Sequence, residues 1–390
     1  MLKIFHLSNK PPFPLKDGGC IAISSILKSL LLAPQTEVFH FTLTTQKHPF
    51  RLEEYPAEWR AKMTIHAEYI KTKTNIFGAF IQLIKNKSYN ISRFESKEVE
   101  ESIKGFLDGV DFDIAILESI YMLPYLHLFK EKGIKVIVRT HNIEHQIWEG
   151  MSKNSKSFWK KKYYGKLAEQ LKRYELNTLA QADGIIAISE EDAHFFQANF
   201  PTLKIKTIPT AVKSNYPIPD YSKDDFYFLG AMDWKPNQEG IKWLLEEVIP
   251  NGIKDSSFHL AGKGLKNNQY KHPSVQTYGE VKSALEFINN HGICLIPLHS
   301  GGGIKIKLLE NMAMGKPIIT TTEGVRGMDL THEKEVLIAD DPIAFTKWMN
   351  ILHQDKDLRR YLGTNAKKYV QTNFDETRLT KRLIEFIRDI

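Results

Sequence analysis

The stretch that decides the fold runs from residue 293 to residue 320 and reads Ile293-Cys294-Leu295-Ile296-Pro297-Leu298-His299-Ser300-Gly301-Gly302-Gly303-Ile304-Lys305-Ile306-Lys307-Leu308-Leu309-Glu310-Asn311-Met312-Ala313-Met314-Gly315-Lys316-Pro317-Ile318-Ile319-Thr320. An apolar run comes first and predicts a buried strand. After the glycines a helical pattern begins and ends before Gly315, and a second apolar run follows. Strand, glycine turn, helix and strand in this order predict an α/β unit whose two strands are parallel.

The same alternation of short apolar runs with longer amphipathic stretches occupies most of the chain, in two series. The first series predicts strands at Leu2–Ser8, Thr36–Leu43, Asp113–Leu117, Lys135–Val138 and Gly184–Ile188, with a helix at Ile21–Leu32. The second predicts strands at Phe226–Leu229, Ser257–Ala261, Ile293–Pro297, Pro317–Thr320 and Val336–Ile338, with helices at Pro342–Tyr369 and Phe374–Ile390. Each series predicts a doubly wound parallel sheet covered by helices on both faces.

Between the two series, Lys213–Asp225 contains two prolines and several charges but no periodic pattern, which is typical of a linker. We therefore predict a Rossmann-like domain over 1–212, the linker 213–225, a second Rossmann-like domain over 226–373 and a C-terminal helix over 374–390. The length of 390 residues suits two domains. Sheets of this kind bind ligands at the carboxyl ends of their strands.

The composition narrows the class of protein. Lys and Arg number 53 against 46 Asp and Glu, a net charge of +7, which favours an anionic partner: a phosphorylated ligand, a membrane surface or nucleic acid. Two distant cysteines, Cys20 and Cys294, exclude a disulfide framework and a cysteine-built zinc site, and they fit a reducing compartment. Neither a signal peptide nor an apolar run of membrane-spanning length is apparent, so we expect a cytoplasmic protein.

The glycine turn and the helix after it carry chemistry suited to a nucleoside diphosphate. Backbone N–H groups at Gly301–Gly303 can approach a ligand closely, and a helix start adds partial positive charge. Lys305 and Lys307 fall in the expected first turn and would add full charges. Glu310, about two turns further on, could accept hydrogen bonds from sugar hydroxyls. A tight turn without a ligand would also need glycines.

Residues 300–330 resemble the donor-binding segment of the retaining glycosyltransferases of family 4, the "group 1" glycosyltransferases, which have the GT-B fold. The resemblance rests on Gly-Gly-Ile-Lys-Ile-Lys-Leu-Leu-Glu, on Met-Ala-Met-Gly-Lys-Pro and on Thr-Thr-Glu-Gly-Val-Arg-Gly, and it extends over nearly the whole chain. It implies that Glu310 binds the nucleotide ribose. It also implies that domain 226–373 binds the nucleotide-sugar donor, that domain 1–212 lies on the acceptor side, and that the C-terminal helix 374–390 crosses back to the N-terminal domain. The first of the two family glutamates falls on Gly302, so this chain departs from the common pattern there.

The resemblance also assigns residues elsewhere. Gly18 and Gly19 match the N-terminal glycine pair, and His141 in Arg139-Thr140-His141-Asn142-Ile143-Glu144-His145 matches the active-site histidine that contacts the donor hexose; Glu144 and His145 are second candidates. The family arginine falls on Ala231, and the lysine matches Lys235 only approximately. The remaining donor-binding candidates are Gly302, Gly303, Ile304, Lys305, Lys307, Gly324 and Arg326.

Three further patterns resemble ligand sites. Asp111-Phe112-Asp113 opens a strand rather than closing one, and the His141–His145 spacing lacks a zinc-protease context, so we expect no metal. Eight basic residues interleaved with aromatics over Met151–Glu175 predict either a helix resting on anionic lipid or a solvated helix whose aromatics pack on the sheet. Nucleic acid ranks third, because no recognised binding module accompanies the basic run.

We therefore expect a metal-independent hexosyltransferase that needs no cofactor. It would move a hexose from a UDP- or GDP-sugar, its co-substrate, to a hydroxyl of a glycan or lipid-linked acceptor in polysaccharide or glycoconjugate synthesis. Retention of configuration is implied by the resemblance alone. Two alternatives stay open: a nucleotide-sugar-binding protein without turnover, and a nucleotide-sugar epimerase or phosphorylase on the same fold.

Overall fold

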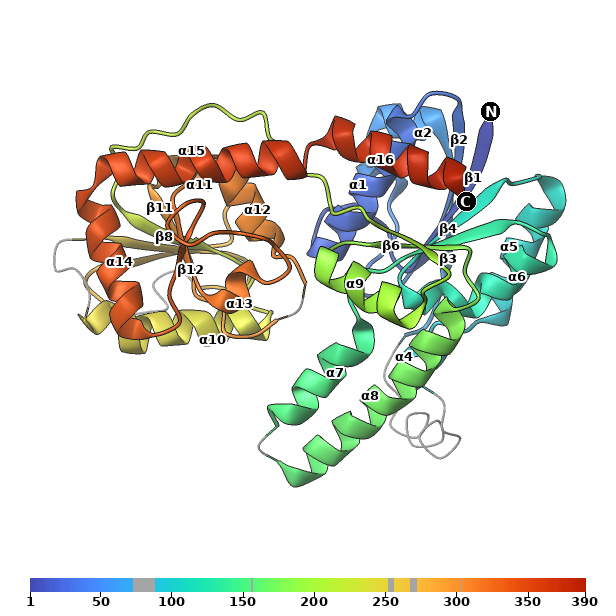
Figure 1. Ribbon diagram of the computed structural model, residues 1–390, viewed down its shortest axis with the longest axis horizontal. Helices are drawn as coiled ribbons and strands as arrows, with labels where there is room; N and C mark the ends of the chain where they lie inside the picture. The colour runs from blue at the N-terminus through green and yellow to red at the C-terminus, as the bar shows by residue number, and fades with distance from the viewer. Residues whose placement is uncertain (73–87, 156, 252–255, 267–271, 302) are drawn as a thin grey trace. The chain divides into compact units, whose positions relative to one another are not determined.

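The structure is a computed structural model that describes residues 1–72, 88–155, 157–251, 256–266, 272–301 and 303–390. The chain divides into two compact units. Unit 1 comprises Met1–Ala211 and Thr377–Ile390, and unit 2 comprises Val212–Glu376. Each unit contains one sheet with helices on both of its faces (Figure 1).

The sheet of unit 1 has the strand order β3-β2-β1-β4-β5-β6-β7, and every neighbouring pair is parallel. The strands are β1 (Leu2–Ser8), β2 (Thr36–Thr44), β3 (Met63–Tyr69), β4 (Ile114–Glu118), β5 (Lys135–Arg139), β6 (Gly184–Ala187) and β7 (Lys204–Thr207). The predicted parallel sheet is confirmed. The sequence did not predict β3 and β7, the two edge strands, because they are polar and only partly buried.

The helices of unit 1 pack against the sheet in two apolar clusters. They are α1 (Gly18–Leu32), α2 (Ala57–Lys62), α4 (Tyr89–Ser92), α5 (Lys97–Gly109), α6 (Leu126–Glu131), α7 (Glu144–Lys153), α8 (Phe158–Leu179), α9 (Glu190–Asn199) and α16 (Glu376–Asp389), with short 3-10 turns at Leu52–Glu54 and Ile120–Tyr125. One cluster joins the sheet to α5, α6, α8 and α9, and the other joins it to α1, α2 and α16. Leu383 and Phe386 of α16 are buried beside Ile4 of β1 and Ile23 of α1, so α16 supplies core to unit 1.

Unit 2 repeats this architecture with the parallel order β10-β9-β8-β11-β12-β13. Its strands are β8 (Phe226–Leu229), β9 (Phe258–Ala261), β10 (Val275–Gly279), β11 (Ile293–Ile296), β12 (Ile318–Thr320) and β13 (Leu337–Ile338). Its helices are α10 (Lys235–Trp243), α11 (Ala284–Asn290), α12 (Ile306–Ala313), α13 (Thr322–Val325), α14 (Pro342–Gln354) and α15 (Lys356–Asn373); a π-helical turn at Leu244–Val248 and a 3-10 turn at Ile249–Asn251 follow α10. Between β7 and β8, residues 208–225 form neither helix nor strand.

Helix boundaries correct the sequence-based expectation in two places. The single helix expected over Pro342–Tyr369 is two helices, because Asp355 ends α14 and its carboxylate caps α15 by accepting the N–H of Leu358 at 2.8 Å. The residue type of Asn237 and the preceding Pro236 predict an N-cap for α10, but Asn237 does not cap this helix. The helix begins at Lys235, and Asn237 lies inside it, where its amide donates to the carbonyl of Ala231 at 2.7 Å.

Candidate active site

The loops after β8, β9, β11 and β12 gather at one edge of the unit 2 sheet, because all these strands are parallel. Two of the loops meet backbone to backbone. A Cβ on Gly262 would lie 1.9 Å from the carbonyl oxygen of Gly230, and Gly262 has a φ of +148°, so only glycine fits at this position. The edge is therefore built to bring the two loops close together.

The glycine turn after β11 is held from within by Lys305. Gly301 and Gly303 both have positive φ, and the Lys305 ammonium donates to their carbonyl oxygens at 3.1 and 2.8 Å. Burial lowers the pKa of Lys305, and Glu323 lies 3.7 Å away. Lys305 was expected in the first helical turn; it is instead the N-cap residue of α12. Its ammonium orders the turn.

Gly302 and Ile304 are two further donor-binding candidates. Gly302 lies outside the described residues. Ile304 is half-buried, and its side chain approaches Gly327, where a Cβ would be 3.1 Å from it. The contact ties the turn after β11 to the segment that follows β12.

Lys307 lies in the first turn of α12, as expected, and contacts residues of β8 and α10. Its ammonium donates to Oδ1 of Asn237 at 2.6 Å and lies 4.5 Å from the ring centroid of Phe228. A Cβ on Gly230 would be 2.6 Å from this ammonium, so the glycine leaves room for it. Burial lowers the pKa of Lys307 to about 8, so most of the ammonium is charged at neutral pH.

Glu310 follows Lys307 by one helical turn, on the same face of α12. Its side chain is exposed, yet enough protein surrounds it to raise the pKa of its carboxyl, an effect that Lys307 opposes. Within the described part of the chain, its carboxylate makes no hydrogen bond or ion pair. The carboxylate is thus open to a ligand at the edge where ligands of such sheets bind.

Three more predicted residues lie at this edge. Lys235 is highly exposed and lies 3.2 Å from Glu239, and Arg326 lies 3.7 Å from Glu323. Exposed pairs of this kind are weak, so both cations can still attract an anion. Gly324 is buried, and its N–H donates to the Thr321 hydroxyl that caps α13 at 3.1 Å.

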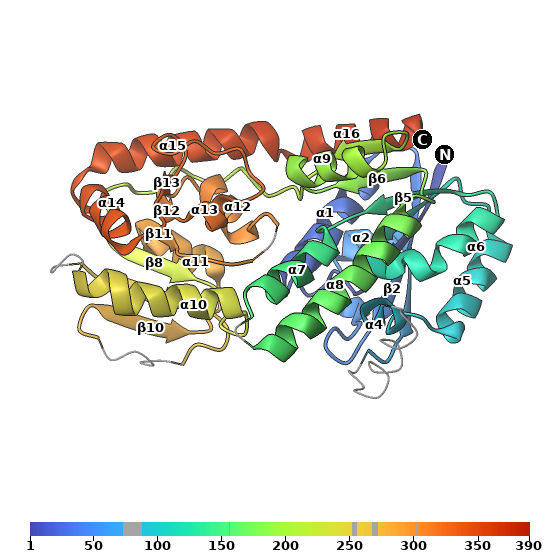
Figure 2. The same ribbon diagram turned by 60° about the horizontal axis from the view of Figure 1, so that its bottom comes forward.

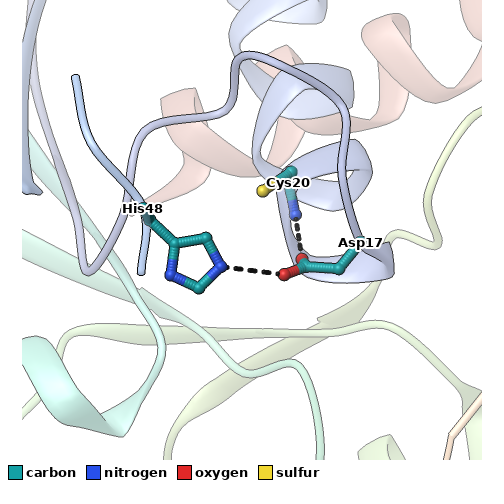
Figure 3. Close-up of side chains that lie close together, drawn as sticks. All are labelled: Asp17, Cys20 and His48. Atoms are coloured by element: carbon teal, nitrogen blue, oxygen red, sulfur yellow. Dashed lines mark hydrogen bonds and ion pairs between the residues drawn. The ribbon is translucent and has the colours of Figure 1, made fainter. Parts of the chain in front are cut away.

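In unit 1, the loops after β1 and β2 meet at Asp17, the N-cap of α1 (Figure 3). Its carboxylate accepts the N–H of Cys20 at 3.0 Å, the ammonium of Lys10 at 2.6 Å and the ring of His48 at 3.1 Å. Burial alone would raise the pKa of Asp17, but these contacts lower it well below its usual range. Gly18 begins α1, and a Cβ on Gly19 would be 2.5 Å from the Lys10 ammonium, so the glycine pair admits a cation at the helix start.

His141 lies beyond β5, and its ring is held by a buried carboxylate that the sequence analysis missed. Glu118, the last residue of β4, is fully buried and accepts from Nε2 of His141 at 2.5 Å and from Nη1 of Arg139 at 3.1 Å. Its other oxygen accepts from Nε2 of His6 at 3.2 Å. One feature of the sequence could have indicated Glu118: it is an acidic residue at the carboxyl end of an apolar strand, at the edge of the sheet where ligands bind.

The hydrogen bonds continue from Glu118 to Tyr55. Nδ1 of His6 lies 3.0 Å from Nδ1 of His40, and Nε2 of His40 lies 3.4 Å from the hydroxyl of Tyr55. A proton on Nε2 of His6 and on Nε2 of His141 satisfies both contacts with Glu118, and the relay closes when Nδ1 of His40 donates to His6 and the Tyr55 hydroxyl donates to His40. In this arrangement Nη1 of Arg139, 3.4 Å from Nε2 of His141, donates to Glu118 rather than to that ring. Nε2 of His141 then carries a proton, and Nδ1 is the atom left for a ligand. Burial lowers the pKa of His141, and the carboxylate of Glu118 opposes this shift.

Glu144 and His145, the second candidates, are held by Glu175 of α8. Its carboxylate accepts the backbone N–H groups of both residues at 3.1 and 3.2 Å and the His145 ring at 2.6 Å. His145 is therefore a buried structural residue at the start of α7. Burial and the nearby Glu175 raise the pKa of Glu144 to about 7, and Tyr121 donates to it at 3.0 Å.

In the described part of the chain, two side-chain clusters contain metal-ligating residue types: Asp17, Cys20 and His48, and Asp225, His259 and His291. In the first, the Lys10 ammonium already contacts the carboxylate, and burial raises the pKa of the Cys20 thiol, which disfavours a thiolate ligand. In the second, the two imidazoles stack with centroids 4.1 Å apart, so both cannot direct a ring-plane lone pair at one ion. Neither arrangement suits a metal.

The Asp-x-Asp motif lies at the other end of the unit 1 sheet. Asp113 immediately precedes β4, and its carboxylate accepts the N–H of Lys3 near the start of β1 at 2.7 Å. This contact is at the amino edge of the strands, away from the ligand loops. The motif serves strand pairing.

Residues 223–355 match the family described as Glycosyl transferases group 1. The chain is 23% identical to an uncharacterized 44.6 kDa protein in the cps region of Klebsiella pneumoniae, over 97% of this chain and 98% of that protein. It is 24% identical to an uncharacterized glycosyltransferase of Methanocaldococcus jannaschii, over 68% of this chain and 72% of that one.

Among solved structures, the fold is similar to that of sucrose-phosphate synthase from Thermosynechococcus elongatus, with a TM-score of 0.72 and 15% identity over 100% of this chain and 99% of that one. It is also similar to Anabaena HepE in complex with UDP and glucose, with a TM-score of 0.66 and 13% identity over 100% of both chains. Two parallel-sheet α/β units and these likenesses define a GT-B fold, as predicted. Together with the family match, they support a glycosyltransferase. No helix in the described ranges is long and apolar enough to cross a membrane.

Proposed function

We propose that the protein is a retaining, metal-independent glycosyltransferase of family 4. It transfers a hexose from a UDP- or GDP-sugar to a hydroxyl of a glycan or lipid-linked acceptor, in the synthesis of cell-surface polysaccharide or glycoconjugate. The match of residues 223–355 supports sugar transfer, and the presence of UDP and glucose in the HepE structure supports a nucleotide-sugar donor. Two buried, free cysteines are in keeping with a cytoplasmic enzyme.

The observation that carries the proposal is the open carboxylate of Glu310 beside the charged edge of unit 2. In the proposal, Glu310 accepts hydrogen bonds from the ribose hydroxyls. Lys307, Lys235 and Arg326 then face the diphosphate together with the N-terminus of α12. Negative charge develops on this group as it leaves, and fixed cations stabilise that charge in the transition state.

His141 acts on the donor hexose. The proposal uses Nδ1 of His141 as the atom that meets a sugar hydroxyl, because Nε2 is bound to Glu118 at 2.5 Å. A neutral imidazole would then accept the hydroxyl proton in a hydrogen bond. No side chain is assigned as a nucleophile, and retention follows from the family resemblance.

Thermal shift with a panel of UDP-, GDP- and ADP-sugars identifies the donor, since a ligand that binds the folded state raises the melting temperature. Glu310→Ala and Glu310→Gln are then expected to weaken donor binding about tenfold to a hundredfold, because hydrogen bonds to a charged group contribute about 1.5–3 kcal/mol. Glu246→Gln, which changes an exposed glutamate 3.8 Å from Lys242, is the matched control.

Two results would contradict the proposal in different ways. Unchanged donor affinity and turnover in both Glu310 variants would remove the ribose assignment. Donor binding without release of nucleotide, in the presence of any acceptor extract, would favour a nucleotide-sugar-binding protein. Two observations favour that alternative. The Lys305 ammonium already donates to carbonyl oxygens of its own turn, and Ala231 stands in the place of the family arginine, so fewer cations are left for the diphosphate.

A further inference from the structure

The α7–α8 hairpin of unit 1 has one half in the core and one half outside it. Leu171 and Leu179, in the second half of α8, are buried in the apolar cluster that also contains the sheet. The first turns of α8 and the last turn of α7 lie beyond this cluster. In both views the two helices lie side by side, and the tip where they join points away from the sheet (Figure 1 and Figure 2).

Large apolar side chains gather at this tip, exposed to solvent. Phe158 is 69% exposed and Trp159 is 76% exposed, and their rings pack edge to face with centroids 5.5 Å apart. Met151 at the end of α7 and Tyr163 in α8 are also exposed. For Phe158 and Trp159, the structure thus contradicts the second alternative offered for residues 151–175, a solvated helix whose aromatics pack on the sheet. Grouped exposed aromatics mark an interaction surface.

The charge at the tip has a single sign. Residues 151–166 contain six lysines and no acidic residue. Lys160, Lys161 and Lys162 are exposed, and within the described ranges none of the three is within ion-pair distance of an acidic residue; Lys156 lies outside those ranges. Further along α8, Lys166 reaches Glu169 at 3.1 Å. Lys160, Lys161 and Lys162 directly follow Phe158 and Trp159 in the first two turns of α8.

We propose that the tip of the α7–α8 hairpin, residues 151–155 and 157–163, docks on the surface of a bilayer that contains anionic lipids. Trp and Tyr rings favour the boundary between lipid headgroups and acyl chains, and lysines near an anionic leaflet are attracted to it. Insertion of the aromatic rings and attraction of the lysines can act together here, because Phe158 and Trp159 begin α8 and the three lysines follow them directly in the chain. The proposal is independent of the proposed function, since it uses no residue of the candidate active site.

The test is flotation of the full-length protein with vesicles. Wild type is expected to float with vesicles of phosphatidylcholine and phosphatidylglycerol in equal amounts, and to remain unbound with phosphatidylcholine alone. The charge variant, Lys160→Gln with Lys161→Gln and Lys162→Gln, is expected to bind about a hundredfold more weakly, because each lysine near an anionic surface contributes a several-fold factor. Phe158→Ser with Trp159→Ser is expected to lose binding while keeping the charge.

The matched control removes the same charge elsewhere, by Lys104→Gln, Lys132→Gln and Lys381→Gln at exposed positions outside the hairpin. It should bind as wild type does. Because all the substituted positions are exposed, the melting temperatures of the variants should match that of wild type, which separates loss of docking from loss of folding. In wild type, lipid with brominated acyl chains should quench tryptophan fluorescence, and Trp159→Ser should lose this quenching.

Several results would overturn the proposal. One is equal binding to neutral and anionic vesicles, and another is vesicle binding by the charge variant at wild-type strength. Absence of vesicle binding at low salt would do the same, because the attraction is strongest there. Binding of a single-stranded RNA homopolymer in place of vesicles would identify the basic aromatic tip as a nucleic-acid surface instead.

Discussion

Replacement of Glu118 by Gln should destabilise unit 1 far more than the small change in shape suggests. Glu118 and Arg139 are both fully buried, and their charges lie 3.1 Å apart. Arg139 has little else to compensate its charge. Its Nη1 also reaches the carbonyl of Ala22 at 3.1 Å, while Nε and Nη2 are buried with no hydrogen-bond partner among the residues that the structure describes. Removing one member of such a pair costs about 3–5 kcal/mol. For a unit of this size, that loss lowers the melting temperature by roughly 6–20 °C.

The assay is a double-mutant cycle measured by urea unfolding and calorimetry. Glu118→Gln and Arg139→Met should each destabilise unit 1 strongly, and the double variant should be more stable than the sum of the two losses implies, because it buries no uncompensated charge. The pKa of Glu118 is held well below its usual range by Arg139, His141 and His6, although burial opposes them. Its contribution is therefore full above about pH 4.3, the ordinary carboxyl value, and declines as the pH falls toward the folded-state pKa.

Strict additivity of the two single variants would refute this reasoning. It would mean that Glu118 and Arg139 do not balance each other, and that the carboxylate acts only through His141 and His6. A Glu118→Gln protein with wild-type melting temperature would refute it more directly. In either case, the role of Glu118 in orienting the His141 ring would have to be tested separately by donor binding.

Two further predictions concern a titration and a glycine. Burial raises the pKa of Glu144 to about 7, so the protonated carboxyl favours the folded state. Its contribution to the free energy of unfolding is full below about pH 4.3 and is lost as the pH rises through 7. Glu144→Gln should therefore flatten the pH dependence of the urea unfolding midpoint between about pH 5 and 8. An unchanged pH profile would argue against that pKa. Gly262→Ala should lower unit 2 stability by more than about 2 kcal/mol, because its Cβ would strike the Gly230 carbonyl, whereas Gly105→Ala in α5, with open space around it, should be neutral or stabilising in the same melting assay.

The two-sheet architecture could be predicted because central parallel strands are buried on both faces and so read as continuous apolar runs. Leu2–Ser8 and Phe226–Leu229 were predicted with the bounds observed. The edge strand Lys204–Thr207 was missed because it needs only one neighbour and carries two exposed lysines. Edge positions relax the apolar pattern on which such predictions depend.

The candidate site was predictable in its parts but not in its contacts. Parallel strands end at a common edge, so the sequence could bring Lys235, Lys307 and Arg326 to one side of a sheet. It could not show that the Lys305 ammonium folds back onto Gly301 and Gly303, because a lysine in a glycine turn has the same local pattern whichever way it points. Glu118 was missed for a related reason: its partners come from residues 6, 139 and 141, which only the tertiary fold assembles.

The position of α16 has a consequence for synthesis of the chain. This helix lies in the core of unit 1 but follows unit 2 in the sequence. While a ribosome makes the protein, the apolar surface around Ile4, Ile23 and Ile116 must wait for Leu383 and Phe386 until all of unit 2 has been translated. Unit 1 therefore cannot complete its fold in the usual N-terminal-first order. During that interval the nascent chain exposes this apolar surface to solvent, and we expect a chaperone to bind it there.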